Sequence, residues 1–325
     1  MTVGSLFTQT FLQPSWSVSR IPSLAGKVAI VTGASAGLGK ITALELARKD
    51  AHVFLVGRSE AKTQAVLDDI KRETGSSKVE LLLADFLDLP TVEAAADKFL
   101  ARGLPLDILV NNAGIMHAPF ELSKQGIESQ FAVNHFATTV FTVRLLPAIK
   151  RAAVPRIVNL SSLTHEDVKK GGIDYANLNN KEKYNRNMRY SETKLANIYF
   201  TTQLQKRLEA AGFKTALVNA VHPGVVKTEL IRHHKEITGS AIGSAIYNSL
   251  VINAQKGALT QLYVAADPEI EAKQYRGKYF VPYAALAEPT AVAKNEEFAA
   301  KTWEWTQEIL QKHYRPDWSW AEARL

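Results

Sequence analysis

Cysteine is absent from this 325-residue sequence, which excludes disulfide bonds, cysteine-ligated zinc, iron–sulfur clusters and thiol nucleophiles. We therefore expect a reducing compartment, the cytoplasm. No run of about 18 apolar residues occurs, so no transmembrane segment is expected. Residues 1–25 lack the basic start and continuous apolar centre of a signal peptide. We expect them to form an arm packed on the body, with peripheral membrane association as the open alternative.

Metal-binding and hydrolytic motifs are also missing. His117, His165 and His222 form no His-x-x-x-His pair, have no fitting acidic partner, and are not accompanied by a Gly-x-Ser-x-Gly elbow. We predict no metal site and no catalytic triad. The expected role of His222 is to brace the turn into Pro223.

Basic residues outnumber acidic ones by 39 to 32, a net charge of +7. Between Arg144 and Lys194 there are eleven basic and five acidic residues, so this segment alone carries +6. The excess indicates either an ordinary solvated surface or a nearby anion, such as cofactor phosphates or a lipid surface. We expect no nucleic-acid partner, because no basic stretch is interleaved with aromatic residues in a recognisable binding module.

Short apolar runs rich in β-branched residues alternate with segments of helical period along the chain. Strands are predicted at 28–32, 52–56, 79–83, 108–110, 156–160, 215–220 and 278–281. Helices are predicted at 39–49, 60–73, 90–102, 125–149, 188–211, 255–266 and 294–312. This alternation predicts a doubly wound α/β fold: one seven-stranded, mostly parallel sheet with helices on both faces.

No composition shift marks a second domain. We expect a dinucleotide-binding catalytic domain at 26–312, preceded by the arm and followed by a tail at 313–325. Two segments near 163–187 and 229–254 break the alternation, and we interpret them as loops over the site. In such sheets ligands bind at the carboxyl ends of the strands.

The first strand leads directly into a glycine-rich turn, Thr32-Gly33-Ala34-Ser35-Ala36-Gly37-Leu38-Gly39, which a helix follows. Glycines allow a tight turn and close approach of the backbone to a pyrophosphate, and the helix N-terminus offers free N–H groups. This placement predicts a Rossmann-type dinucleotide site. Its expected contacts are Gly33, Ser35, Ala36, Gly37, Leu38 and Gly39.

The end of the second strand usually decides between the two nicotinamide cofactors, since an acidic residue there binds ribose hydroxyls. Here Gly57 leaves that position empty and Arg58 follows, and an arginine suits a 2′-phosphate. We predict NADP(H); the alternative is that Arg58 is a surface arginine with no role in cofactor binding. Asp85, after the third strand, is either a partner of the adenine amino group or a turn residue.

Five motifs occur in order. Four of them follow predicted strands: Thr32-Gly33-x-x-x-Gly37-x-Gly39, Asn111-Asn112-Ala113-Gly114, Ser161-Ser162 and Pro223-Gly224. The fifth, Tyr190-x-x-x-Lys194, lies in the predicted helix 188–211. Together they resemble the short-chain dehydrogenase/reductase family over about residues 25 to 312. The segments Lys194-Leu195-Ala196-Asn197 and 222–230 resemble its retinol dehydrogenase and WW-domain oxidoreductase-like branch.

Tyr190 and Lys194 carry the predicted proton chemistry. A free tyrosine has a pKa of about 10, so it donates and accepts protons poorly near neutrality. Four residues apart on a helix, the two side chains share a face, and the ammonium can stabilise the phenolate. The resemblance makes Tyr190 the general acid/base and adds that Lys194 binds the nicotinamide ribose.

The resemblance implies further roles. Ser162 holds the substrate oxygen, while turn capping suits Ser161 better. Asn134 is a fourth catalytic member that bends its helix around a proton-relaying water, a solvent-facing asparagine being the alternative. The expected contacts on the adenosine side are Asn111, Asn112, Ala113 and Gly114. Those near the nicotinamide carboxamide are Pro223, Gly224, Val225 and Thr228.

The interval from Ser162 to Tyr190 is 28 residues (190 − 162), which implies an insertion. Its residues Tyr175, Asn177, Tyr184 and Arg186 are expected to rim the pocket. A lipophilic substrate is indicated by Leu230, Ile231, Ile237, Ile242 and Ile246.

We therefore predict an NADP(H)-dependent enzyme that interconverts a carbonyl and an alcohol on a lipophilic small molecule. The alternatives are a non-catalytic nucleotide-binding regulator and a carbon–carbon double-bond reductase. The resemblance also implies a homodimer built on helices 125–149 and 188–211. The tail with Trp318 and Trp320 either closes over the pocket or forms a contact surface.

Overall fold

The computed structural model describes residues 14–226 and 251–320. The predicted contact Thr228, the five apolar residues between 230 and 246, and most of the second predicted loop lie outside the described residues. The predicted doubly wound α/β fold is confirmed in a single eight-stranded sheet.

The sheet has the strand order β3-β2-β1-β4-β5-β6-β7-β8. The strands are β1 (Val28–Thr32), β2 (His52–Gly57), β3 (Val79–Leu83), β4 (Ile108–Asn111), β5 (Arg156–Leu160), β6 (Leu217–Val221), β7 (Tyr279–Val281) and β8 (Ala285–Ala287). All pairs are parallel except β7 with β8. The sequence prediction missed β8, because three half-exposed residues after a turn carry no apolar period.

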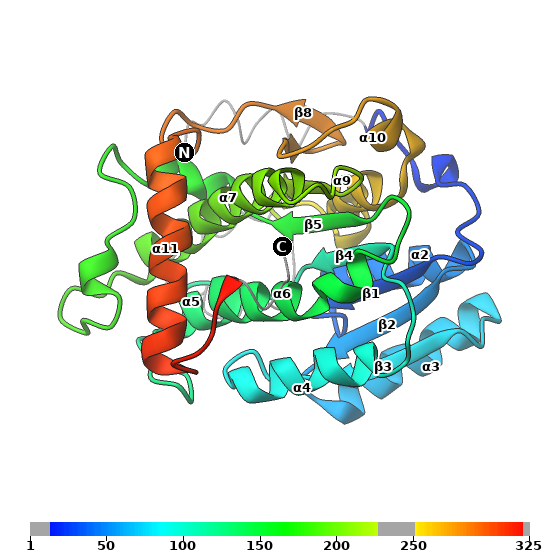
Figure 1. Cartoon of the computed structure of the whole chain (residues 1–325). Helices are drawn as coiled ribbons and strands as arrows, with labels where there is room; N and C mark the ends of the chain where they lie inside the picture. The colour runs from blue at the N-terminus through cyan, green and yellow to red at the C-terminus, as the bar shows by residue number, and fades with distance from the viewer. Residues whose placement is uncertain (1–13, 227–250, 321–325) are drawn as a thin grey trace, which may run out of the picture.

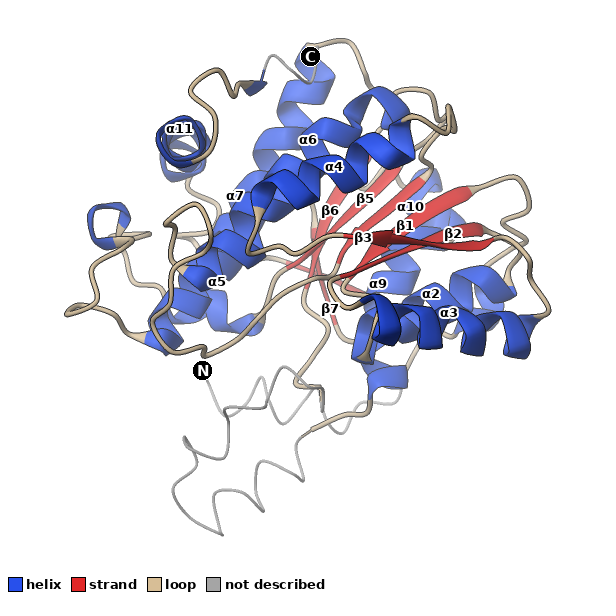
Figure 2. Ribbon diagram, turned by 90° about the horizontal axis from the view of Figure 1, so that it is seen from below, coloured by secondary structure: helices blue, strands red, loops and turns tan. Residues whose placement is uncertain are grey.

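Helices cover both faces of the sheet, as Figures 1 and 2 show. One layer contains α2 (Gly37–Arg48), α3 (Glu60–Thr74), α9 (Ala254–Ala266) and the short α10 (Pro268–Ala272). The other contains α4 (Leu89–Leu100), α5 (Ser129–Phe131), α6 (Ala137–Ile149), α7 (Arg186–Ala210) and α11 (Glu296–His313). None of the helices within 14–226 and 251–320 is long and apolar enough to cross a membrane.

Alternation along the strands builds two separate cores. Val28 and Ile30 of β1 join the core under α4, α6 and α7, whereas Ala29 and Val31 join the core under α2, α3 and α9. Every residue of β1 is buried, as expected for a central parallel strand with helices on both sides.

The two ends of the described chain are held by aromatic side chains. Trp16 is buried and its indole N–H donates to Asp267 Oδ2 at 2.6 Å. At the other end, Trp320 stacks on Trp303 of α11 at 3.5 Å between ring centroids, and Trp318 is buried beside it. Figure 1 shows α11 across the helices of this layer, where it packs against α7.

Candidate active site

The glycine-rich turn between β1 and α2 is closed by backbone packing. A Cβ on Gly39 would lie 2.4 Å from Gly33 O and 2.6 Å from Asn112 Nδ2. Gly33 has φ +65°, and its own Cβ would lie 2.9 Å from Ala113 Cα. Only glycine fits these two positions, because any side chain would push the turn apart.

The N-terminus of α2 offers its N–H groups to a ligand. In the described part of the chain no side chain caps this helix, whose N-cap residue is Ala36, and its first turn holds no acidic residue. Such a helix end binds an anion through its free N–H groups and its dipole. The residues between Gly33 and Gly39 therefore fit the pyrophosphate of a dinucleotide.

Asn112 supports this turn rather than facing a ligand directly. Its Nδ2 donates to Thr32 O at 2.8 Å, while the Thr32 hydroxyl accepts from the backbone N–H of Asn112 and of Ala113, both at 2.9 Å. Asn111 joins the central strands instead, since its Nδ2 donates to Asn159 Oδ1 on β5 at 2.8 Å. These contacts hold the ends of β1, β4 and β5 in register.

At the end of β2, Gly57 is explained by packing. Its Cβ would lie 2.2 Å from Thr63 Oγ1 on α3, so an acidic residue at this position would have to displace the Thr63 side chain. Arg58 follows with an exposed side chain. Asp85, after β3, forms a turn in which its Oδ1 accepts from Leu87 N at 3.0 Å.

Tyr190 and Lys194 lie four residues apart on α7, and both are buried. The Lys194 ammonium lies 5.3 Å from the centre of the Tyr190 ring and donates to Leu160 O at 3.3 Å. Burial lowers the pKa of Lys194 to about 8, because the charged form loses its hydration. The amine therefore changes protonation close to neutral pH.

Asn134 is not a solvent-facing residue. It lies in a π-helix, Ala132–Phe136, between α5 and α6, so the predicted continuous helix over 125–149 is interrupted there. Its Oδ1 accepts from Ile115 N at 2.8 Å, and its Nδ2 donates to Ile115 O at 2.9 Å and to Thr193 Oγ1 at 3.0 Å. A π-helix often marks a functional position.

Of the two serines after β5, Ser161 was expected to cap a turn, but Ser162 is the capping residue. Ser162 caps the following 3-10 helix, since its Oγ accepts from Thr164 N at 3.2 Å. Ser161 is buried, and its hydroxyl donates to Lys194 O at 2.7 Å. This bond fixes the strand end against the helix that carries Tyr190.

The turn after β6 approaches the glycine-rich turn through apolar contacts. Gly224 has φ +91°, and its Cβ would lie 2.9 Å from Ile252 Cδ1. Val226 pairs with Ile252 in an isolated parallel bridge and packs with Leu38 of α2. Pro223, Gly224 and Val225 thus lie at the same edge of the sheet as the turn of residues 33–39.

Gly114 shows how the predicted residues converge. A Cβ at this position would lie 3.2 Å from Asn134 Oδ1 and 3.6 Å from Lys194 Nζ. The end of β4, the π-helix and α7 therefore meet at one point, at the carboxyl edge of the sheet where ligands bind in doubly wound folds.

Comparison of the sequence with known proteins points to one family. The family model for short chain dehydrogenases matches residues 27–238. An uncharacterized oxidoreductase from Schizosaccharomyces pombe is 38% identical over 92% of this chain and 89% of its own. Human retinol dehydrogenase 13 is 38% identical over 86% of this chain and 83% of its own.

The chain belongs to the short-chain dehydrogenase family.

Within this family, the chain is in the retinol dehydrogenase-like branch; human retinol dehydrogenase 12 is 36% identical over 88% of the chain. A solved structure of an uncharacterized protein from Mycobacterium paratuberculosis is 29% identical, covers 92% of the chain, and superposes with a TM-score of 0.71. A Beutenbergia cavernae protein solved with bound NADP is 28% identical over 80% of the chain, with a TM-score of 0.63. The short-chain dehydrogenase is therefore an oxidoreductase that binds a nicotinamide cofactor.

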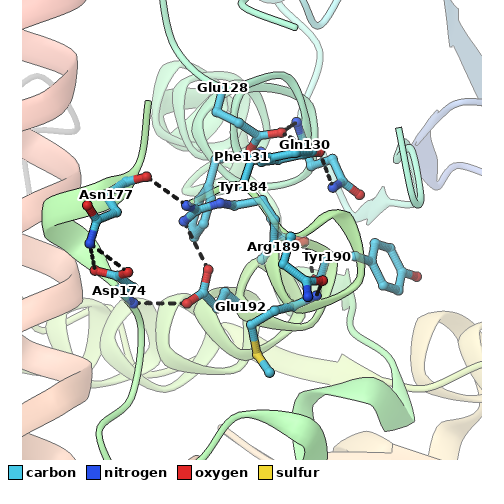
Figure 3. A network of polar contacts seen from close by, with 12 residues as sticks. Glu128, Gln130, Phe131, Asp174, Asn177, Tyr184, Arg189, Tyr190 and Glu192 are labelled. Carbon is cyan, nitrogen blue, oxygen red and sulfur yellow. Dashed lines mark hydrogen bonds and ion pairs between the residues drawn. The ribbon is translucent and has the colours of Figure 1, made fainter. Parts of the chain in front are cut away.

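Sequence reasoning missed a buried polar network beside Tyr190, drawn in Figure 3. Arg189 and Glu192 form an ion pair at 2.9 Å with only 5% of each side chain exposed. Glu128 and Gln130, at the start of α5, are also fully buried. The i, i+3 spacing of Arg189 and Glu192 was the available signal, but that spacing is common on solvated helices.

Proposed function

We propose that this short-chain dehydrogenase interconverts a carbonyl and an alcohol on a lipophilic small molecule with NADP(H). The observation that carries the proposal is the position of the buried Lys194 ammonium, 5.3 Å from the centre of the Tyr190 ring. A Cβ on Gly114 would contact both this ammonium and Asn134. These residues lie at the edge of the sheet that also carries the glycine-rich turn. Within this family of oxidoreductases, that constellation suits proton transfer to and from a carbonyl oxygen.

The residues of the turn would hold the cofactor's pyrophosphate, and a nicotinamide bound there would be the source of the hydride for the carbonyl carbon. Gly33 and Gly39 allow the turn to close tightly, and the N–H groups at the start of α2 would hold the phosphates. Pro223, Gly224 and Val225 are proposed to face the nicotinamide end.

Tyr190 is proposed to give its phenolic proton to the carbonyl oxygen and to take one back in the reverse direction. Lys194 favours the resulting phenolate while its amine is protonated. The Ser162 hydroxyl accepts from Thr164 N, which leaves its own hydrogen to donate to the substrate oxygen. Asn134 joins Ile115 to Thr193 of α7, and is proposed to hold the water that exchanges protons with Lys194.

The preference for NADP(H) is supported by the end of β2. Gly57 cannot be replaced by an acidic residue without displacing Thr63, and the exposed Arg58 provides a guanidinium for a 2′-phosphate. The Beutenbergia cavernae relative has bound NADP. The test is to measure Kd for NADPH and NADH, with tighter binding of NADH as the contrary result. Asp85 is proposed as a turn residue that leaves its second oxygen for adenine.

The activity is tested by incubating the protein with NADPH and a panel of retinoid-like aldehydes, steroid ketones and aliphatic ketones. Tyr190→Phe is expected to lower kcat about 10²–10⁴-fold while retaining NADPH binding. Tyr275→Phe, at the opposite end of the sheet, is the matched control and should keep full activity. Undiminished turnover in Tyr190→Phe would reject the mechanism.

The other two candidate functions give different results in the same panel. A nucleotide-binding regulator binds NADPH and turns over no carbonyl. A double-bond reductase consumes NADPH with enones and yields the saturated ketone, which product analysis distinguishes from the allylic alcohol.

A homodimer and a cytoplasmic location also remain proposals. The predicted dimer contact uses α6 and α7, and α11 already covers part of α7. Sedimentation at micromolar concentration gives the dimer mass if the remaining surface suffices. Fractionation tests the location and the alternative of a peripheral membrane contact.

A further inference from the structure

The loop that follows β4, residues 115–118, is held by polar side chains from three different segments. Asn134 bonds both backbone groups of Ile115, as described above. The backbone N–H of His117 donates to Gln130 Oε1 at 2.9 Å. The hydroxyl of Tyr184, in the insertion, donates to Ala118 O at 2.8 Å. A loop of four residues is thereby fixed at three of them.

His117 adopts a conformation that its own backbone disfavours. Its φ is +55°, a left-handed value that costs free energy for any residue with a Cβ. Glycine or asparagine would satisfy the turn at lower cost. The imidazole is half-buried and lies edge-on to the Tyr190 ring, with 5.6 Å between the ring centroids. A strained backbone that brings a polar ring to the proposed proton donor indicates a use for that ring.

Gln130 transmits the position of the insertion to His117. Its side chain is fully buried, and Nε2 donates to Tyr184 Oη at 2.8 Å and to Arg186 O at 2.9 Å (Figure 3). With Oε1 accepting from His117, every strong hydrogen-bonding group of the amide is engaged. The amide therefore has one orientation, which fixes the backbone of His117.

Tyr184 stays protonated in this arrangement. Burial is the largest cause that raises the pKa of Tyr184 above its ordinary value, and the nearby Glu128 carboxyl raises it further. The neutral hydroxyl can thus donate to Ala118 while it accepts from Gln130.

The insertion that carries Tyr184 is anchored to the helix of Tyr190. Arg189 Nη2 donates to Asn177 O at 2.8 Å, and Glu192 Oε1 accepts from Asp174 N at 2.9 Å. On α7 this pair faces away from Tyr190 (Figure 3). The contacts form a closed ring: from α7 through the insertion to Gln130, on to His117, and back to the Tyr190 ring.

We propose that His117 is a specificity-determining residue, whose imidazole binds a second oxygen on the carbon next to the reacting carbonyl. Gln130 and Tyr184 are positioning residues for it. The substrate class is an α-dione or α-hydroxy ketone, because the imidazole lies beside the ring whose hydroxyl holds the reacting oxygen. The proposal rests on the proposed carbonyl chemistry of Tyr190.

The test compares octane-2,3-dione with octan-2-one, in which a methylene group at C3 replaces the second carbonyl. Either carbonyl of the dione has an oxygen next to it, so the site of reduction does not affect the comparison. With saturating NADPH, His117→Phe is expected to lower kcat/KM for the dione at least about tenfold and for octan-2-one less than about threefold. His117→Asn, which keeps a polar side chain and tolerates the backbone conformation, should retain more of the dione activity. Equal losses on both compounds would overturn the proposal.

Binding separates this proposal from the reaction itself. Tyr190→Phe with bound NADP⁺ cannot reduce either compound, because NADP⁺ has no hydride to donate, so the Kd of each compound can be measured by calorimetry. Adding His117→Phe is expected to weaken the dione about tenfold and to leave octan-2-one unchanged. Failure of the dione to bind more tightly than octan-2-one contradicts the role of His117. Absence of turnover in the wild type, with this binding difference retained, contradicts only the proposed function.

The positioning role is tested with two tyrosines of the insertion. Tyr184→Phe removes the bonds to Gln130 and Ala118 and the longer one to Glu128 Oε1 at 3.3 Å, and should reduce the dione-to-ketone ratio of kcat/KM about threefold. Tyr175→Phe is the matched control, because the Tyr175 hydroxyl bonds Thr302 of α11 at 2.8 Å instead. It should leave the ratio unchanged. Equal changes of the dione-to-ketone ratio in the two variants would refute the role of Tyr184 in holding the loop of residues 115–118.

Discussion

The turn of residues 33–39 and the region around Tyr190 are shaped by different forces. In the turn, the fit is set by backbone atoms: a single Cβ on Gly39 would meet a carbonyl oxygen at 2.4 Å. On α7, buried charged side chains make the contacts: Lys194 lies against the Tyr190 ring, while Arg189 and Glu192 face away from that ring and bind the insertion. The cofactor side thus depends on the absence of side chains, and the substrate side on their correct pairing.

The largest effect is expected where a buried charge loses its partner. Arg189→Met should lower the free energy of unfolding by about 3–5 kcal/mol, because the buried Glu192 carboxyl loses the cation that pairs with it. The double variant Arg189→Met/Glu192→Leu should recover most of the loss. Urea unfolding measures both.

The matched control is Lys206→Met, whose ion pair with Glu296 is more than half exposed on both sides. It should cost at most about 1 kcal/mol. If Lys206→Met and Arg189→Met destabilise equally, the buried pair has no special role on the substrate side.

On the cofactor side, Gly39→Ala should raise Kd for NADPH about 100-fold, or about 2.7 kcal/mol, since the turn must open to admit a methyl group. Gly171→Ala is the control, because its Cβ would meet no atom within 4 Å. Quenching of protein fluorescence by NADPH reports both affinities. An unchanged Kd in Gly39→Ala would show that backbone packing does not set this side.

The pH dependence of kcat/KM tests the region around Tyr190 alone, because the buried Lys194 ammonium lies there and not in the glycine-rich turn. The pKa of Lys194 is lowered to about 8, and the protonated amine is the form that favours the phenolate. kcat/KM for carbonyl reduction should therefore fall as the pH rises through about 8, by about tenfold per pH unit. Lys194→Arg should remove this step from its residual activity, because a guanidinium keeps its proton. A wild-type rate that is constant to about pH 10 would contradict the role of Lys194.

The smallest effect is expected at an exposed charge. Arg58→Ala should raise Kd for NADPH about tenfold and leave NADH unchanged, because only NADPH carries the 2′-phosphate. Arg72→Ala, exposed on α3, is the control and should change neither. Equal weakening of both cofactors would mean that Arg58 does not recognise the phosphate.

Most of the fold was predictable from local pattern. All seven predicted strands and the long helices occur within a few residues of their predicted limits, because apolar period and β-branched runs are local properties. The strand β8 was missed, since Ala285–Ala287 has no such pattern and exists through its pairing with β7. The family resemblance implied a bend of the helix at Asn134, but the π-helix over Ala132–Phe136 was not predicted.

The sites divide in the same way. The glycines of residues 33–39 and the Tyr190–Lys194 spacing act within one or two turns of the chain, so the sequence alone determined where they would lie. Other contacts join residues that are 33 to 66 positions apart: those of Ser161 with Lys194, and of Tyr184 with Gln130 and Ala118. The role of Ser162 depends on contacts of this kind. A side chain at that separation has many chemically equivalent partners, and only packing of the insertion on α7 selects one. Tertiary structure therefore decided how the substrate side is built.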